Sequence, residues 1–238
     1  MRPRGPAATD TRMIDLPATL FIDGEALVVD KPAGLATTTP KRGGPSLEAL
    51  LPELRFGFGR PPAIVHRLDQ DTSGCLILAR NPKALKRFGQ AFEAGGVAKL
   101  YLGVVEGVPE AEEGLIDMSL GKVSSAAEGW RMTRDPNGKT ARTRWRRLGA
   151  VGGRALVAFM PETGRTHQIR VHAAEGLGAP LVGDAVYGRP DGVKARLALH
   201  AHRISLPRDG KPPVAAEAPV PPLFATLGFP DIAVPPCA

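Results

Sequence analysis

Apolar and polar positions alternate over short stretches along most of this chain, and glycine or proline closes each stretch. Such alternation predicts β-strands, because successive side chains of a strand point to opposite faces. Residues 118–130 show only a weak pattern. Strands are expected at residues 20–30 (two strands around the turn Asp23-Gly24), 63–68, 74–79, 99–105, 140–148, 154–160 and 195–206.

Three stretches have helical spacing instead. Ser46 is an N-cap residue before apolar positions that predict a helix over residues 46–54. Asn81-Pro82 predicts the start of a second helix, and a third is expected over residues 166–175. Strands outnumber helices without alternating regularly with them. The pattern therefore predicts an α+β fold, with a largely antiparallel mixed sheet flanked by helices and loops.

Length and composition indicate one large domain, or one domain with a small appendage. The chain has 238 residues, of which 43% are hydrophobic. Residues 1–16 carry charge but no apolar core, so they are expected to be a flexible lead before a domain at residues 17–238. No stretch approaches the ~18 apolar residues of a membrane span. A cytoplasmic protein without a membrane partner is expected.

Charge indicates a polyanionic partner. Lysine and arginine outnumber aspartate and glutamate by 31 to 24, which gives a net charge of +7. Cys75 and Cys237 form neither a disulfide framework nor a zinc-type cluster. His200 and His202 share a strand face, but no acidic or cysteine ligand accompanies them nearby, so no metal site is expected. The chain also lacks the glycine-rich loops that bind nucleotides.

Two polar segments stand out against this background. The first, HRLDQDTSG at residues 66–74, lies between two apolar stretches. Its carboxylates, Asp69 and Asp71, are either turn-formers or reactive groups. The second, ETGRTHQIRVH at residues 162–172, leads into the third expected helix, where backbone N–H groups favour anions. Its alternative interpretation is a solvated, charged start of a helix.

Together these segments resemble the RluA-type pseudouridine synthases, which isomerise uridine in RNA. The resemblance covers about residues 20–225 in family order. Two positions depart from the family pattern: Gly103 stands where alanine is usual, and Ala179 where histidine is usual. The matching pieces are HRLDxxTSG at 66–74, ETGRTHQIRxH at 162–172, KxYL at 99–102, GAPLVGD to YG at 178–188, LHA at 199–201 and DKPAG at 30–34.

The resemblance implies the reaction and its central residues. Asp69 would be the nucleophile, and whether it attacks C1′, attacks C6 or assists a glycal-forming path stays open. Tyr101 would stack on the flipped uracil, and Arg165 would pair with Asp69. No oxidation occurs, so no cofactor is expected. The substrate is expected to be structured RNA, either ribosomal or transfer RNA.

The same resemblance suggests residues that bind substrate. Arg67 would occupy the stack that the flipped base leaves, and Ile169 would form an apolar wall. Gln168, Arg170 and His66 join this set, with His66 expected to be mainly structural. For grip on RNA, Arg142, Arg144 and Arg146 share one strand face. The alternative is that these three arginines only protect a solvated edge strand.

A monomer with no obligate protein partner is expected, and no S4-type RNA-binding domain precedes the first predicted strand. One rival is a non-catalytic RNA-binding domain, against which the intact Asp69, Tyr101 and Arg165 argue. A second is a glycosidase-like hydrolase, which normally needs a second carboxylate beside Asp69. Asp71 and Glu162 are candidates for that carboxylate by sequence order alone.

Overall fold

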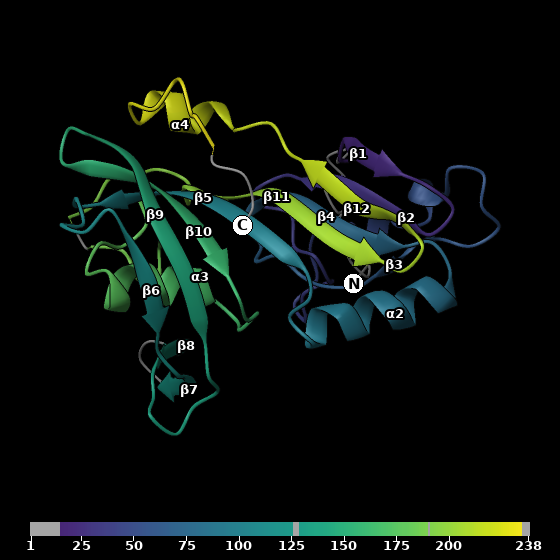
Figure 1. Cartoon of the computed structure of the whole chain (residues 1–238), viewed down its shortest axis with the longest axis horizontal. Coiled ribbons are helices and arrows are strands. Elements are labelled where there is room, and N and C mark those ends of the chain that lie inside the picture. The colour runs from purple at the N-terminus through teal and green to yellow at the C-terminus, as the bar shows by residue number, and fades with distance from the viewer. Residues whose placement is uncertain (1–14, 126–128, 190, 235–238) are drawn as a thin grey trace, which may run out of the picture.

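The computed structural model describes residues 15–125, 129–189 and 191–234, which form one large sheet and a separate hairpin (Figure 1). The sheet order is β1-β2-β4-β11-β5-β10-β9-β6, with β3 beside β4 and β12 beside β11. The sheet strands are β1 (Thr19–Ile22), β2 (Ala26–Lys31), β3 (Ala63–Ile64), β4 (Ser73–Ala79), β5 (Ala98–Glu106), β6 (Glu113–Asp117), β9 (Arg142–Val151), β10 (Arg154–Pro161), β11 (Leu199–Arg208) and β12 (Lys211–Glu217).

Strand pairing in the described residues is antiparallel except between β4 and β11, which run parallel. This confirms the predicted α+β class and its largely antiparallel mixed sheet. The hairpin joins β7 (Leu120–Ser125) to β8 (Gly129–Arg134) and projects from one end of the molecule (Figure 1). The helices are α1 (Leu47–Leu50), the 3-10 turn η1 (Glu53–Arg55), α2 (Pro82–Glu93), α3 (Gln168–Val171), the π-helical turn η2 (His172–Gly176) and α4 (Pro222–Thr226).

Helices cover both faces of the sheet, because its strands bury apolar side chains on both sides. In β5, the even-numbered residues such as Leu102 pack with Phe224 of α4. The odd-numbered Val105 packs with Ile169 of α3 instead. In the half that contains β2 and β4, one core packs on α2 and another on α1 and η1. Because successive side chains of each strand point to opposite faces of the sheet, the predicted alternation places them in separate hydrophobic cores.

Two of the three predicted helix starts are confirmed, whereas the third helix begins at Gln168 instead of residue 166. The Ser46 hydroxyl accepts a hydrogen bond from the Ala49 N–H (3.2 Å), and the Asn81 side chain accepts one from the Ala84 N–H (2.8 Å). Each side chain satisfies a backbone donor that has no partner within the helix. Helix α2 ends just before Gly95, whose φ of 72° is accessible to glycine at little cost.

Two predicted stretches differ from the structure. Only Ala63–Ile64 of the strand expected over residues 63–68 pairs in the sheet, because the chain turns into a polar loop from His66. The weak pattern of residues 118–130 contains most of the hairpin, whose exposed strands lack an apolar face to signal them. Strand β9 is no edge strand either, because β6 and β10 flank it. Residues 1–14 of the expected lead lie outside the described residues.

The parallel contact of β4 and β11 requires a glycine. Gly74 has a φ of 110°, and a Cβ at this position would lie 2.2 Å from the carbonyl oxygen of Ala201. Beside it, the Ser73 hydroxyl and Nδ1 of His200 are 2.8 Å apart. The loop at residues 66–72 therefore enters the middle of the sheet at a fixed point.

No helix among the described residues combines the length and the apolar character that crossing a membrane requires.

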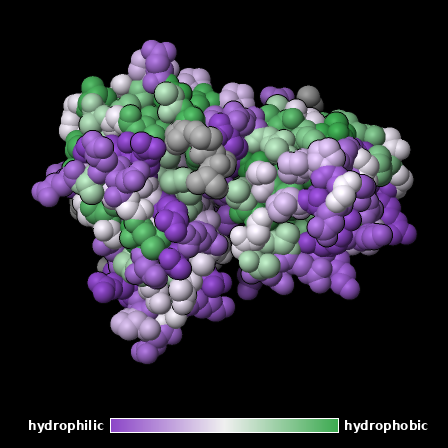
Figure 2. All heavy atoms as spheres, viewed as in Figure 1, coloured by the Kyte–Doolittle hydropathy of each residue, from purple (hydrophilic) through white to green (hydrophobic). Residues whose placement is uncertain are grey.

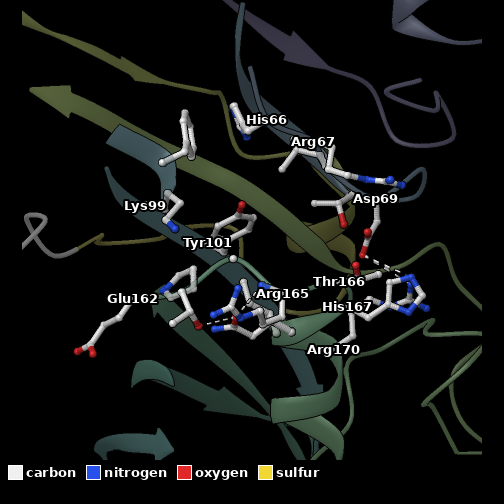
Figure 3. Close-up of a pocket in the computed structure, with 18 of the residues that line it drawn as sticks. His66, Arg67, Asp69, Lys99, Tyr101, Glu162, Arg165, Thr166, His167 and Arg170 are labelled. Atoms are coloured by element: carbon white, nitrogen blue, oxygen red, sulfur yellow. Dashed lines mark hydrogen bonds and ion pairs between the residues drawn. The ribbon is translucent and has the colours of Figure 1, made fainter. Parts of the chain in front are cut away.

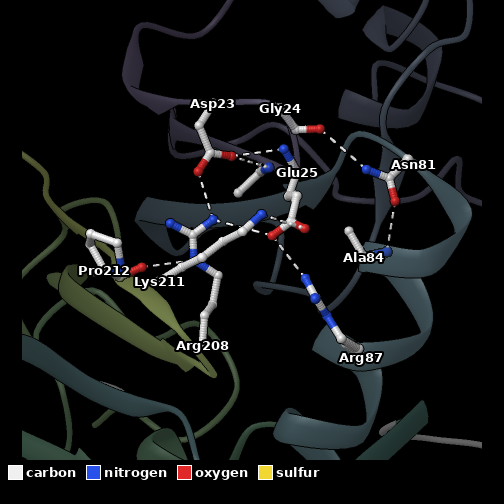
Figure 4. Close-up of polar contacts among 10 residues, drawn as sticks. Asp23, Gly24, Glu25, Asn81, Ala84, Arg87, Arg208, Lys211 and Pro212 are labelled. Carbon is white, nitrogen blue, oxygen red and sulfur yellow. Dashed lines mark hydrogen bonds and ion pairs between the residues drawn. The ribbon is translucent and has the colours of Figure 1, made fainter.

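A cluster of five charged side chains joins the β1–β2 turn to α2 and to the β11–β12 hairpin (Figure 4). Arg208 Nη1 donates to Asp23 (2.6 Å), while Glu25 lies 2.8 Å from Arg87 and 3.1 Å from Lys211. Burial acts to raise the pKa of Asp23, but hydrogen bonds from backbone N–H groups and from Arg208 outweigh it and lower that pKa. The cluster therefore stabilises the fold while Asp23 is ionised.

We expect Arg208→Met to lower the free energy of unfolding by about 1–2 kcal/mol at pH 6, because the arginine side chain is almost fully buried. Since the folded-state pKa of Asp23 is lowered, its contribution is present above its ordinary pKa and disappears as the pH falls below it. Urea unfolding at several pH values measures this. Arg146→Met, which removes an exposed pair with Glu113, serves as a control with an expected change below about 0.5 kcal/mol. A difference unchanged from pH 6 to pH 3 would contradict the assignment.

Candidate active site

The two polar segments singled out in the sequence face each other across a cleft of about 530 Å³ (Figure 3). One wall is the loop at residues 66–72, and the other is the segment at residues 161–170. The end of α2 and Tyr101 of β5 complete the lining. A concave site of this volume, with convergent charged groups, suits a small planar ligand.

Lys31 anchors the loop that carries Asp69. Its buried ammonium donates to the carbonyl oxygens of Pro32 (2.9 Å), Leu35 (2.7 Å) and Gln70 (3.1 Å). Burial lowers the pKa of Lys31 to about 8, although the charges of Asp71 and Asp69 oppose this. One cation thus joins two loops through their backbones.

Thr37 anchors the same loop on the other side of Asp69. Its hydroxyl donates to the Leu68 carbonyl (2.7 Å) and accepts from the Leu68 N–H (3.2 Å). Gln70 is held in turn, because its carbonyl accepts from the Gly34 N–H (2.9 Å). The residues before and after Asp69 are both fixed, so the backbone leaves its carboxylate little freedom.

The Asp69 carboxylate points across the cleft towards His167 and Arg170 (Figure 3). Its Oδ2 atom lies 3.8 Å from Nη1 of Arg170 and 3.8 Å from Nε2 of His167, and its side chain is 21% exposed. These separations exceed hydrogen-bond length, so the oxygens stay available to a ligand. Asp69 is a partly open carboxylate beside a cation.

Arg170 is held in place by Asp184. The two side chains form a bidentate pair, with Nε–Oδ2 at 2.8 Å and Nη2–Oδ1 at 2.7 Å. Burial acts against the charge of Arg170, but the hydrogen bonds and attraction from Asp184, followed by the charge of Asp69, raise its pKa. Asp184 also accepts backbone hydrogen bonds from Val186 and Tyr187. The Arg170 guanidinium is therefore a fixed positive charge.

Arg165 does not take the predicted place beside Asp69. Its Nε donates to the Thr140 carbonyl (3.0 Å), and its backbone N–H donates to the Gln168 side chain (2.9 Å). Arg165 still lines the cleft, below Tyr101 in Figure 3. The reason is positional: Arg165 precedes α3, whereas Arg170 lies on α3 and faces the cleft. Both arginines belong to one motif, and its sequence does not distinguish them.

The Gln168 amide joins neighbouring segments of the protein through hydrogen bonds and is not a free contact for a ligand. Its amide nitrogen donates to the Arg142 carbonyl and to the Thr143 hydroxyl, both at 2.9 Å. Its carbonyl oxygen accepts from the Thr163 hydroxyl (2.7 Å) and from the Arg165 N–H. These four bonds use the amide's whole capacity, so the predicted substrate contact through Gln168 would have to replace one of them.

His66 is built into the edge of β4. Its Nε2 accepts from the Ile77 N–H (2.9 Å), and its ring stacks on Phe92 with centroids 4.3 Å apart. Burial, with a smaller effect of Lys99, lowers the pKa of His66 to about 3. The ring is therefore neutral with its proton on Nδ1, a structural arrangement.

Tyr101 and Ile169 line the cleft, and Arg67 is exposed at its mouth. Burial raises the pKa of Tyr101, and the charge of Asp69 adds to this effect. The phenol therefore keeps its proton at neutral pH. The cleft therefore contains the phenol ring of Tyr101, the apolar wall of Ile169 and the planar cation of Arg67.

Three aromatic residues of the site were given no role in the sequence analysis, although His167 and Tyr187 lie within the quoted motifs. His167 has a φ of 53°, in the left-handed region. Its Nδ1 lies 2.9 Å from the Tyr187 hydroxyl, and its ring stacks on Trp130 at 5.1 Å. Trp130 and Tyr187 come from distant segments, so only the fold could bring them to His167.

Each arginine of the β9 row has an acidic partner. Arg142 lies 3.4 Å from Asp117, Arg144 2.7 Å from Glu162 and Arg146 3.6 Å from Glu113. The side chains of these pairs are largely exposed, so each pair contributes little to stability. The carboxylates nevertheless offset the positive charge that the sequence suggested for holding RNA.

The described residues contain no group of three or more His, Cys, Asp or Glu side chains that could hold a metal. His200 is buried and bonded to Ser73, and burial lowers its pKa to about 4. Burial raises the pKa of the Cys75 thiol to about 12, so this cysteine is unreactive. Cys237 lies outside the described residues.

We expect Lys31→Met to lower the free energy of unfolding by about 2–4 kcal/mol, because three carbonyls lose their donor. Lys99→Met is the matched control. Burial also lowers the pKa of Lys99, but its ammonium makes no hydrogen bond to any described residue. The control should therefore be neutral or stabilising in urea unfolding. Equal losses in both variants would show that the three carbonyl bonds contribute nothing specific.

Comparisons with known proteins agree with this geometry. The model of the RNA pseudouridylate synthase family matches residues 25–175. An uncharacterised RNA pseudouridine synthase of Zymomonas mobilis is 56% identical over 88% of this chain and 96% of its own length. The ribosomal large subunit pseudouridine synthase D of Nitrosomonas europaea is 39% identical over 87% of this chain and 63% of its own length.

A solved structure has the same fold. The human RNA pseudouridylate synthase domain containing 1 superposes with a TM-score of 0.73 at 27% identity, over 95% of this chain and 89% of that protein. The family match covers the Asp69 loop, Tyr101 and Arg170. This chain therefore belongs to the RNA pseudouridylate synthase family, whose members isomerise uridine to pseudouridine in RNA.

Proposed function

We propose that this enzyme modifies uridine in structured ribosomal or transfer RNA, with Asp69 as its nucleophile. The observation that carries the proposal is a partly open carboxylate, fixed through its backbone and placed beside a guanidinium that Asp184 immobilises. Such a carboxylate can attack carbon or stabilise positive charge on the ribose. The RluA-type relatives named for the ribosomal large subunit support an RNA of that kind.

The reaction exchanges one bond for another. The N1–C1′ bond of uridine breaks, the uracil turns, and a C5–C1′ bond forms. The proton on C5 leaves and N1 gains one, so product and substrate have the same composition. Asp69 attacks either C1′ or C6, or assists loss of a ribose proton on a glycal path. Each of these routes needs Asp69 to be ionised within reach of the sugar.

The target base has to leave its stack to reach this carboxylate, which costs a few kcal/mol. The cleft of about 530 Å³ has room for a uracil between Tyr101 and Ile169. Arg67, exposed at the mouth, can fill the vacated stack with its planar guanidinium. Tyr101 keeps its proton, so it acts as a ring to stack on and as a hydrogen-bond donor.

Arg170 has the electrostatic role that the sequence suggested for Arg165. Its positive charge lies 3.8 Å from Asp69 and attracts the carboxylate, while the bidentate pair with Asp184 keeps it from closing on Asp69. Arg165, bonded to a backbone carbonyl on the same wall, is a candidate for holding the phosphate or ribose of the target. We place the enzyme in the cytoplasm, acting as a monomer without an obligate partner.

We expect the wild-type enzyme to release tritium from RNA labelled at uridine C5, and Asp69→Asn to release none above background. Unmodified transfer RNA and ribosomal RNA are assayed separately, which also assigns the substrate class. Asp71→Asn is the control, because Asp71 is exposed on the same loop outside the cleft lining. Turnover by Asp69→Asn close to wild type would refute the nucleophile.

We expect Arg170→Met to lower kcat by roughly 100-fold or more, since it removes the cation beside the reacting carboxylate. Arg165→Met should act mainly on KM, because Arg165 has no contact with Asp69 among the described residues. Single-turnover kinetics on the same RNA separate the two effects. The opposite result, with kcat lost in Arg165→Met and kept in Arg170→Met, would return the pairing role to Arg165.

A further inference from the structure

The hairpin β7–β8 is anchored to the wall of the cleft, although none of its described residues pairs with a strand of the large sheet. An isolated bridge joins Leu120 at its base to Lys139, in the segment that leads to β9. The Met132 N–H donates to the Tyr187 hydroxyl (3.0 Å), and the Arg134 N–H donates to Glu175 (3.0 Å). Tyr187 is the residue that bonds to His167. The hairpin is thus placed relative to the catalytic groups by direct contacts.

Trp130 lies on the face of the hairpin that turns towards the cleft. Residues 130 and 132 point to the same side of β8, and Met132 packs against the core that includes α3. The indole stacks on His167 at 5.1 Å and 26°, and His167 is one of the residues that line the cleft. Trp130 therefore lies at the rim of the cleft, with the His167 ring between it and Asp69.

A large part of this indole faces solvent. Trp130 is 48% exposed, whereas the chain's other tryptophan, Trp145, is 6% exposed. The ammonium of Lys122, diagonally across the hairpin, lies 5.1 Å from the Trp130 ring. An exposed indole with an adjacent cation has the chemistry that binds an unpaired base and its phosphate.

Core packing explains Trp130 less well. Stacking on His167 uses only part of the ring, and a smaller apolar residue would cover His167 without exposing an indole to water. The arginine row on β9 is offset by carboxylates.

We propose that Trp130 is a stacking platform for an unpaired base that flanks the target uridine, with Lys122 on the adjoining phosphate. The inference rests on the proposed action on RNA and specifies how that RNA is held outside the cleft. Figure 2 shows the projecting end of the molecule that carries the hairpin as mostly hydrophilic, as expected of a surface that meets RNA. A notch separates it from the surface over α2 (Figure 2).

Fluorescence tests the platform without any need for turnover. In a Trp145→Phe variant the emission comes from Trp130 alone. We expect a short oligouridylate to quench it, and an abasic ribose-phosphate oligomer of equal length to leave it unchanged. The reciprocal Trp130→Phe variant, which keeps only the buried Trp145, should respond to neither. Equal quenching by both oligomers, or by neither, would overturn base stacking.

Kinetics then separate this role from a structural one. We expect Trp130→Leu to raise KM for the reactive RNA by roughly 5-fold to 100-fold, the range that stacking on one aromatic ring produces. Trp130→Phe should restore most of the affinity, and kcat should fall much less than KM rises. A fall in kcat with KM unchanged would contradict base stacking on Trp130. It would indicate instead that Trp130 acts by positioning His167. Quenching of Trp130 by oligouridylate in an enzyme that releases no tritium would instead refute the proposed reaction alone.

Discussion

The buried ammonium of Lys31 is the interaction on which the geometry of the site depends. An isolated charge in a protein interior is unfavourable, and here three backbone carbonyls offset that penalty. Two of these carbonyls belong to the loop after β2, and one belongs to the loop of Asp69. The position of the Asp69 carboxylate is therefore fixed through Lys31 by β2, a strand with neighbours on both sides in the sheet.

Charge alternates across the cleft in a chain that begins at Asp184 and passes through Arg170 to Asp69. The first link is short and bidentate, and the second is longer, at 3.8 Å. This inequality matters because a tight pair with Arg170 would occupy the oxygens of Asp69. By forming the bidentate pair with Arg170, Asp184 leaves the oxygens of Asp69 accessible. Of the two carboxylates beside this guanidinium, Asp184 holds it in place and Asp69 stays open to the cleft.

Much of this could be predicted from sequence, because local patterns report local physics. Alternation identified the central strands, and capping residues identified the starts of α1 and α2. The hairpin β7–β8 was not predicted, because its exposed strands bury too few side chains to require alternating apolar positions. The roles of Gln168 and Arg170 depend on which way each side chain leaves the short helix α3, and the role of Arg165 depends on its place before that helix. The sequence of the motif does not encode either. The aromatic group around His167 joins segments that only tertiary folding brings together.

The contact between Gly74 and Ala201 also affects how the enzyme is made. These residues are paired in the parallel ladder although 127 positions separate them, and the contact has room for no side chain at residue 74. A ribosome must synthesise most of the chain before β11 can pair with β4. Until then the Asp69 loop lacks its neighbour in the sheet, and closing so long a loop is slow. The nascent chain therefore cannot complete the sheet beside the Asp69 loop until β11 has been synthesised.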